Sequence, residues 1–134
     1  MDEAGLIEWL RFARDDLEVA GMLLTMHSRK IEIICYHCAQ SAEKYLKAAL
    51  FFDELPIPRI HNLLTLADIV GGRHPEVLEM GRSLADLQPY AVVVRYPLEL
   101  SVAAGDEELA FNAASRIAER MEVLFGAPRG TRRS

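Results

Sequence analysis

Apolar residues recur at steps of three and four along most of the chain, and this spacing predicts α-helices. The clearest example runs from Ile34 to Leu50. Its apolar side is built largely from small residues: Cys35, Cys38, Ala42, Leu46 and Ala49. A polar stripe follows the same rhythm on another side: His37, Gln40, Ser41, Lys44 and Lys47. Because small side chains let a second helix approach closely, we predict that this segment is the central helix of the core.

The same spacing predicts two helices before the middle of the chain. The first runs from about Ala4 to Met26 and carries a stripe of leucine and alanine with Trp9 and Phe12 beside it. A shorter helix runs from Leu63 to about Val70 and is closed by two glycines. The polar turn at His27-Ser28-Arg29-Lys30 that follows the first helix is short, which favours antiparallel neighbours.

Prolines and glycines divide the second half of the chain. Pro75 suits a first helical turn, and we expect the helix that follows to end at Gln88-Pro89. Residues 90–97 are rich in valine, and without a partner strand we expect an extended segment that lies across the helices. After Gly105, acidic residues indicate the start of a last helix, which reaches about Phe125.

These elements predict an all-α protein, an up-and-down helical bundle of four long helices and one short helix. A length of 134 residues fits one domain, and we place the bundle at residues 1–126. A hydrophobic fraction of 51% is sufficient for a core of that size. Residues 127–134 are predicted to be a disordered basic tail.

The distribution of charge limits the classes of partner. The formal net charge is −5, and Arg129, Arg132 and Arg133 lie in the tail, so that removing their three charges leaves −8. Such a body lacks the broad basic face of a general nucleic-acid binder, although a local basic pocket remains possible. No apolar run has the length of a membrane span, and the acidic start at Met1-Asp2-Glu3 does not resemble a secretory signal. We therefore expect a cytoplasmic protein without membrane partners.

Cys35 and Cys38 form a Cys-x-x-Cys pair, a spacing found in zinc sites and in redox motifs. Zinc usually takes four ligands, and the sequence has no second pair at matching spacing. A redox pair follows a strand, whereas this pair lies inside a helical pattern. We predict two buried, reduced thiols, with no metal site and no cofactor.

One group of polar residues is a candidate binding site. Arg95 follows four apolar residues and precedes Tyr96-Pro97, and a guanidinium binds phosphate or carboxylate through two parallel hydrogen bonds. Glu43 is its expected internal partner, and Tyr96 offers a ring on which a base can stack. Further donors come from the polar stripe and a later loop: His37, Gln40, Lys44 and His61. Two interpretations stay open, a structural Arg95–Glu43 ion pair and a ligand site.

Four sequence blocks, taken in order, resemble the HEPN domain family over about residues 6–125. The first is Trp-Leu-x-x-Ala-x-x-Asp-Leu from Trp9 to Leu17, and the strongest is Cys-Ala-Gln-Ser-Ala-Glu-Lys-Tyr-Leu-Lys-Ala from Cys38 to Ala48. His61-Asn62-Leu63 and Val94-Arg95-Tyr96-Pro97 complete the series. The resemblance implies a helical bundle that forms a homodimer, often encoded beside a minimal nucleotidyltransferase as a toxin–antitoxin-like pair.

Many HEPN proteins are metal-independent ribonucleases with an Arg-x(4–6)-His motif. Here Arg95 is followed by residues 96–102, which contain no histidine, so we assign no catalytic residue. The expectation is a nucleotide- or RNA-associated binding module, one half of a two-component system with a minimal nucleotidyltransferase. Two alternatives remain: a ribonuclease that uses His37 or His61 instead, and an interaction partner without a ligand of its own.

Overall fold

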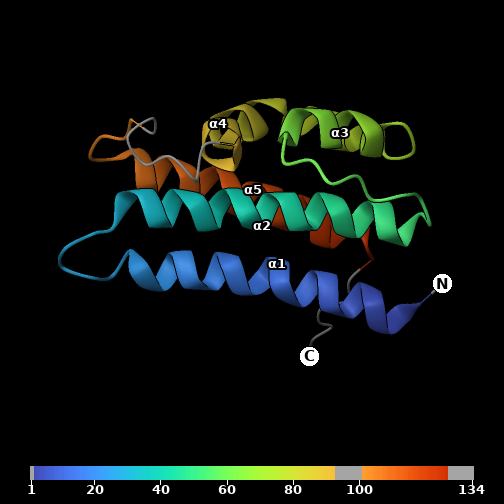
Figure 1. Cartoon of the computed structure of the whole chain (residues 1–134), viewed down its shortest axis with the longest axis horizontal. Helices are drawn as coiled ribbons and strands as arrows, with labels where there is room; N and C mark the ends of the chain where they lie inside the picture. Colours follow the sequence, from blue (N-terminus) through green and yellow to red (C-terminus); the bar gives the residue numbers. More distant parts are fainter. Residues whose placement is uncertain (1, 93–100, 127–134) are drawn as a thin grey trace.

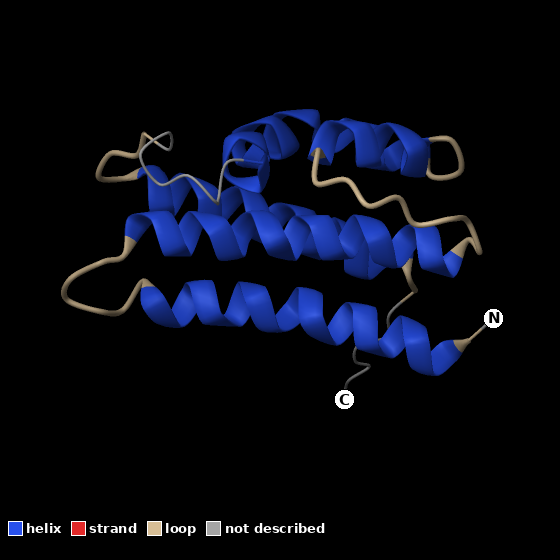
Figure 2. Ribbon diagram, viewed as in Figure 1, coloured by secondary structure: helices blue, strands red, loops and turns tan. Residues whose placement is uncertain are grey.

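The computed structural model describes residues 2–92 and 101–126, which form five α-helices and one 3₁₀ helix. The elements are α1 (Glu3–Leu23), α2 (Ile31–Phe52), α3 (Leu63–Gly71), the 3₁₀ helix η1 (Pro75–Met80), α4 (Gly81–Val92) and α5 (Asp106–Leu124). The described residues contain no strand. The prediction of an all-α bundle is therefore confirmed (Figure 2).

Helix α2 is the centre of the bundle, as predicted. It packs against α1 on one side, against α5 on another, and against α3 and α4 on a third (Figure 1). Ile34, Leu46 and Leu50 of α2 are completely buried, together with Leu63 of α3 and Ile117 of α5. Although α2 contacts four other helices, Tyr36, His37, Gln40 and Lys44 remain partly exposed along it.

The helix ends have identifiable caps. Asp2 accepts a hydrogen bond from the Gly5 amide at 3.0 Å, and Asn62 accepts one from the Thr65 amide at 3.0 Å. The Gln88 side chain of α4 accepts a hydrogen bond from the Leu63 amide at 2.9 Å, which joins the start of α3 to α4. The same oxygen also accepts from the Leu64 amide at 3.3 Å, so side chains satisfy three orphan amides at the start of α3, two of them through Gln88 of α4.

The predicted end of the fourth helix at Gln88-Pro89 is wrong, because α4 continues through Pro89 to Val92. Pro89 is exposed, and so is Ala85, whose carbonyl loses its helical partner when residue 89 has no amide hydrogen. Water can therefore satisfy that carbonyl, while Leu87 and Ala91 stay buried and hold the helix in place. Residues 90–92, expected to be extended, are consequently helical.

Other expectations fall partly outside the described residues. Residues 93–97 of the predicted extended segment and the predicted tail at residues 127–134 are not described. Helix α1 ends at Leu23, three residues before the predicted end at Met26, whereas α5 starts at Asp106 as expected. No helix in the described ranges has the length and apolar character that crossing a bilayer requires.

Candidate functional site

The polar stripe of α2 meets α1 at the carboxylate of Asp16. Its Oδ1 lies 2.9 Å from His37 Nδ1, and its Oδ2 accepts a hydrogen bond from Lys44 Nζ. His37 and Lys44 are seven residues apart, so both lie on the same side of α2, two turns from one another. The Asp16 side chain is only 12% exposed, whereas those of His37 and Lys44 are 26% and 28% exposed. One nearly buried carboxylate thus orients two donors that solvent still reaches; we call these three residues the Asp16 cluster.

Aromatic rings surround the Asp16 cluster. The Phe12 ring is 47% exposed, and its centroid lies 5.6 Å from Lys44 Nζ and 4.5 Å from the guanidinium carbon of Arg11. The Tyr36 and His37 rings meet edge to face, with their centroids 5.4 Å apart. Cations and aromatic rings therefore alternate across the surface where α1 and α2 meet, which we call the α1–α2 face.

Glu43 organises a second group on α2. Its buried carboxylate accepts a hydrogen bond from Lys47 Nζ at 2.9 Å and lies 3.0 Å from Nδ1 of His61, whose side chain is 63% exposed. The expected Glu43–Arg95 ion pair lies outside the described residues, as do Arg95 and Tyr96 themselves. Within the described chain, Glu43 therefore fastens the loop that precedes α3 to the central helix.

The structure brings together only some of the predicted site residues. His37 and Lys44 share Asp16, whereas Glu43 and His61 belong to the second group. Gln40 lies half-buried on α2, three residues from His37 and three from Glu43. Asp16 was not predicted as a site residue, although it is the acidic position of the first block that resembles the HEPN family, Trp9 to Leu17, and this block was the available signal.

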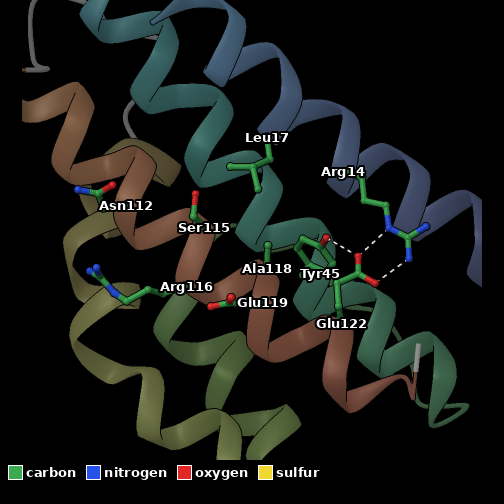
Figure 3. A pocket seen from close by; sticks show the side chains of 9 residues that line it. All are labelled: Arg14, Leu17, Tyr45, Asn112, Ser115, Arg116, Ala118, Glu119 and Glu122. Carbon is green, nitrogen blue, oxygen red and sulfur yellow. Dashed lines mark hydrogen bonds and ion pairs between the residues drawn. The ribbon is translucent and has the colours of Figure 1, made fainter. Parts of the chain in front are cut away.

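A groove between α1 and α5 lies on another side of the bundle (Figure 3). It has a volume of about 620 Å³, and at one end the Glu122 carboxylate accepts hydrogen bonds from Arg14 at 2.6 and 2.7 Å. The hydroxyl of buried Tyr45 donates to the same carboxylate at 2.6 Å. Burial, followed by the Glu122 carboxylate, raises the pKa of Tyr45 above its ordinary value. These three residues, which we call the Glu122 network, join α1, α2 and α5.

The Glu122 network gave no signal in the sequence. Glu122 is 108 residues from Arg14 and 77 from Tyr45, so no local spacing relates them. His74 is a similar case, because its partner lies 21 residues away in the sequence. Its side chain is 18% exposed, and Nε2 lies 2.8 Å from the carboxylate of Asp53. This contact joins the end of α2 to the turn before η1.

The two cysteines pack in the core as predicted. Cys35 and Cys38 are both completely buried and both free. Burial raises the pKa of Cys35 to about 11 and that of Cys38 to about 12, so that both stay protonated at neutral pH. Across residues 2–92 and 101–126, no three histidine, cysteine or acidic side chains are grouped so that they could hold a metal ion.

Comparison with known proteins assigns a family to this arrangement. The family model described as HEPN domain matches residues 7–124, which is most of the chain and includes every helix described above except the first residues of α1. No curated protein and no solved structure matches the chain. The family match agrees with the all-helical fold and with the resemblance of the sequence blocks. The chain is therefore a member of the HEPN domain family.

Proposed function

We propose that this chain is a nucleotide- or RNA-associated binding module whose ligand contacts the α1–α2 face. The observation that carries the proposal is the Asp16 cluster, in which a carboxylate 12% exposed holds His37 and Lys44 at a surface that solvent reaches. Here the donors stay accessible while their positions are fixed.

The geometry leaves hydrogen-bonding capacity for a phosphate. Lys44 has three ammonium hydrogens, more than its bond to Asp16 requires. Of the two ring nitrogens of His37, only Nδ1 contacts Asp16. His37 Nε2 is therefore the ring nitrogen that remains for a ligand. A phosphate oxygen beside Lys44 would accept an ammonium hydrogen from a side chain that Asp16 already orients, and the imidazolium form of His37 would add a second donor at Nε2.

The aromatic neighbours supply the second requirement of nucleotide recognition. Unpaired bases stack on exposed aromatic side chains, and cations beside these rings hold the backbone phosphates. Phe12 offers such a ring beside Lys44 and Arg11. The net charge of the whole chain is −5, which opposes general binding to nucleic acids. This local arrangement therefore favours a single ligand site.

The proposal includes residues and partners beyond the Asp16 cluster. We propose that Arg95 and Tyr96 complete the site, with Gln40 beside it and with Glu43 and His61 at its border. We further propose that two copies form a homodimer and that the protein acts with a minimal nucleotidyltransferase in a toxin–antitoxin-like pair. The support for these partners is membership of the HEPN family.

A thermal-shift screen against nucleotides and short RNAs tests the proposal. A ligand that binds only the folded protein stabilises it by about 2.7 kcal/mol when the free ligand concentration is 100 times its Kd. This stabilisation raises the melting temperature. We expect a shift in the wild type that Lys44→Met and Arg95→Ala reduce. Arg59→Gln, which removes an exposed arginine from the loop before α3, should leave it unchanged.

Two results would contradict the proposal. The first is a ligand shift that Lys44→Met leaves intact, which would place the ligand elsewhere. The second is the absence of any shift, which would favour the interaction partner without its own ligand. Co-purification with a nucleotidyltransferase from the same cells would then be the next measurement.

A further inference from the structure

A second groove lies where η1 and α4 meet α5. Its volume is about 400 Å³, and its charged lining consists of three arginines and two glutamates: Arg82, Arg116, Arg120, Glu79 and Glu119. The groove therefore carries a net charge of +1, while the rest of the chain carries −6. A concave surface of positive sign on an acidic protein is a local departure from the overall charge, and concave walls strengthen its field.

The side chains in this groove are partly oriented. Arg116 Nε donates a hydrogen bond at 3.1 Å to Oγ of Ser83, which is only 7% exposed, so that this arginine is fixed near its Nε. Arg120 Nη2 donates to Glu79 at 2.7 Å. Arg82 is exposed and makes no hydrogen bond or ion pair with the residues that the structure describes. The terminal amino groups of Arg116 are likewise not engaged within that part of the chain.

Two of the three guanidinium groups in the groove lack a carboxylate partner among the described residues, while Arg120 pairs with Glu79. Arg116 and Arg120 are four residues apart on α5, so their like charges lie on the same side of the helix. The chain has 20 acidic residues, and yet Arg82 and Arg116 have no carboxylate partner among the described residues. Guanidinium groups bind phosphate oxygens through paired hydrogen bonds, and two such groups beside one another match its geometry.

We propose that the groove between η1, α4 and α5 binds a phosphate group through Arg82, Arg116 and Arg120, with Ser83 positioning Arg116. This site is separate from the α1–α2 face and does not rest on the function proposed there. In Figure 1, α5 lies behind α2, and Figure 3 shows Arg116 on the opposite side of α5 from Arg14. The phosphate belongs either to a nucleotide monoester or to an RNA diester, and the two share this chemistry.

Titration of the ¹⁵N-labelled full chain with inorganic phosphate tests the site, with chloride balancing the ionic strength. We expect saturable shifts of backbone amides in residues 81–84 and 115–120. The double variant Arg82→Gln/Arg116→Gln should bind phosphate at least tenfold more weakly, and an unchanged melting temperature shows that it is folded. A matched control, Arg59→Gln/Arg73→Gln, removes two arginines outside the groove and should bind as the wild type does.

The proposal is overturned if the shifts increase linearly without saturation, or if the Arg82/Arg116 variant binds phosphate as tightly as its control. Lys44→Met should not change phosphate binding here, which separates this site from the α1–α2 face. Adenosine monophosphate and the dinucleoside ApA then distinguish the sources of the phosphate. Competition by the monophosphate alone identifies a monoester ligand, and competition by ApA identifies the RNA diester.

Discussion

The Asp16 cluster and the Glu122 network are built alike, but their donors differ in exposure to solvent. Each has one carboxylate with two donors that come from other elements. In the Glu122 network, Tyr45 is 2% exposed, whereas the Arg14 side chain is 48% exposed. In the Asp16 cluster, both donors remain about one quarter exposed. The two groups therefore differ in one donor: the Glu122 network contains a buried hydroxyl that depends on the carboxylate, whereas both donors of the Asp16 cluster also reach water.

The largest expected effect is on the Glu122 network. Glu122→Ala leaves the buried Tyr45 hydroxyl without its acceptor and Arg14 without its partner, and should lower the free energy of unfolding by about 2–4 kcal/mol. Urea unfolding measures this loss. Glu119→Ala, which removes an exposed glutamate from the same helix, should cost less than about 0.5 kcal/mol. Equal losses in the two variants would show that the network does not stabilise the bundle.

The contrast between the two groups also explains what the sequence could predict. Helical spacing identified α2 and its polar stripe because His37, Gln40 and Lys44 are close in sequence. It could not identify Glu122 as the partner of Tyr45, because that contact depends on how α5 packs against α2. Pro89 was misread for a related reason, since only the fold shows that its side of α4 faces solvent. Local periodicity predicts elements, whereas contacts between elements require the packing.

A smaller effect is expected in the Asp16 cluster. Asp16→Ala removes the acceptor of His37 and Lys44, and because both donors can turn to water, the free energy of unfolding should fall by only about 1–2 kcal/mol. The neighbouring Asp15→Ala, on the exposed side of α1, is the control and should be nearly neutral. Ligand binding should fall in Asp16→Ala and not in Asp15→Ala. A loss of stability as large as that of Glu122→Ala would remove the distinction between the two groups.

The smallest effect concerns the start of α5, which lies outside both groups. The Glu107 carboxylate accepts from its own amide and from the Gly105 amide at 2.9 Å, and it pairs with Arg29 at 3.2 Å. The hydrogen bond from its own backbone amide lowers the pKa of Glu107 most. The hydrogen bond from Arg29 has the next largest lowering effect. A carboxyl with a lowered folded-state pKa stabilises the protein above its unfolded value of 4.5, and this contribution is lost as pH falls through the folded value.

Urea unfolding between pH 7 and pH 3 tests this dependence. The wild type should lose stability below about pH 4.5, and Glu107→Gln should lose less over the same interval, because one carboxylate that must be protonated is absent. Glu108→Gln is a suitable control, since that side chain also pairs with Arg29 but is 61% exposed. Identical pH profiles for the wild type and Glu107→Gln would contradict the assigned contacts.

The most direct test of the central claim is to locate a bound RNA on the protein. Backbone amide shifts of the ¹⁵N-labelled chain, followed during titration with a short single-stranded RNA, report which face the ligand contacts. The account predicts saturable shifts around Phe12, Asp16, His37 and Lys44, and their loss in Lys44→Met. Saturable shifts confined to α5 and the Glu122 network, with none at the α1–α2 face, would contradict it.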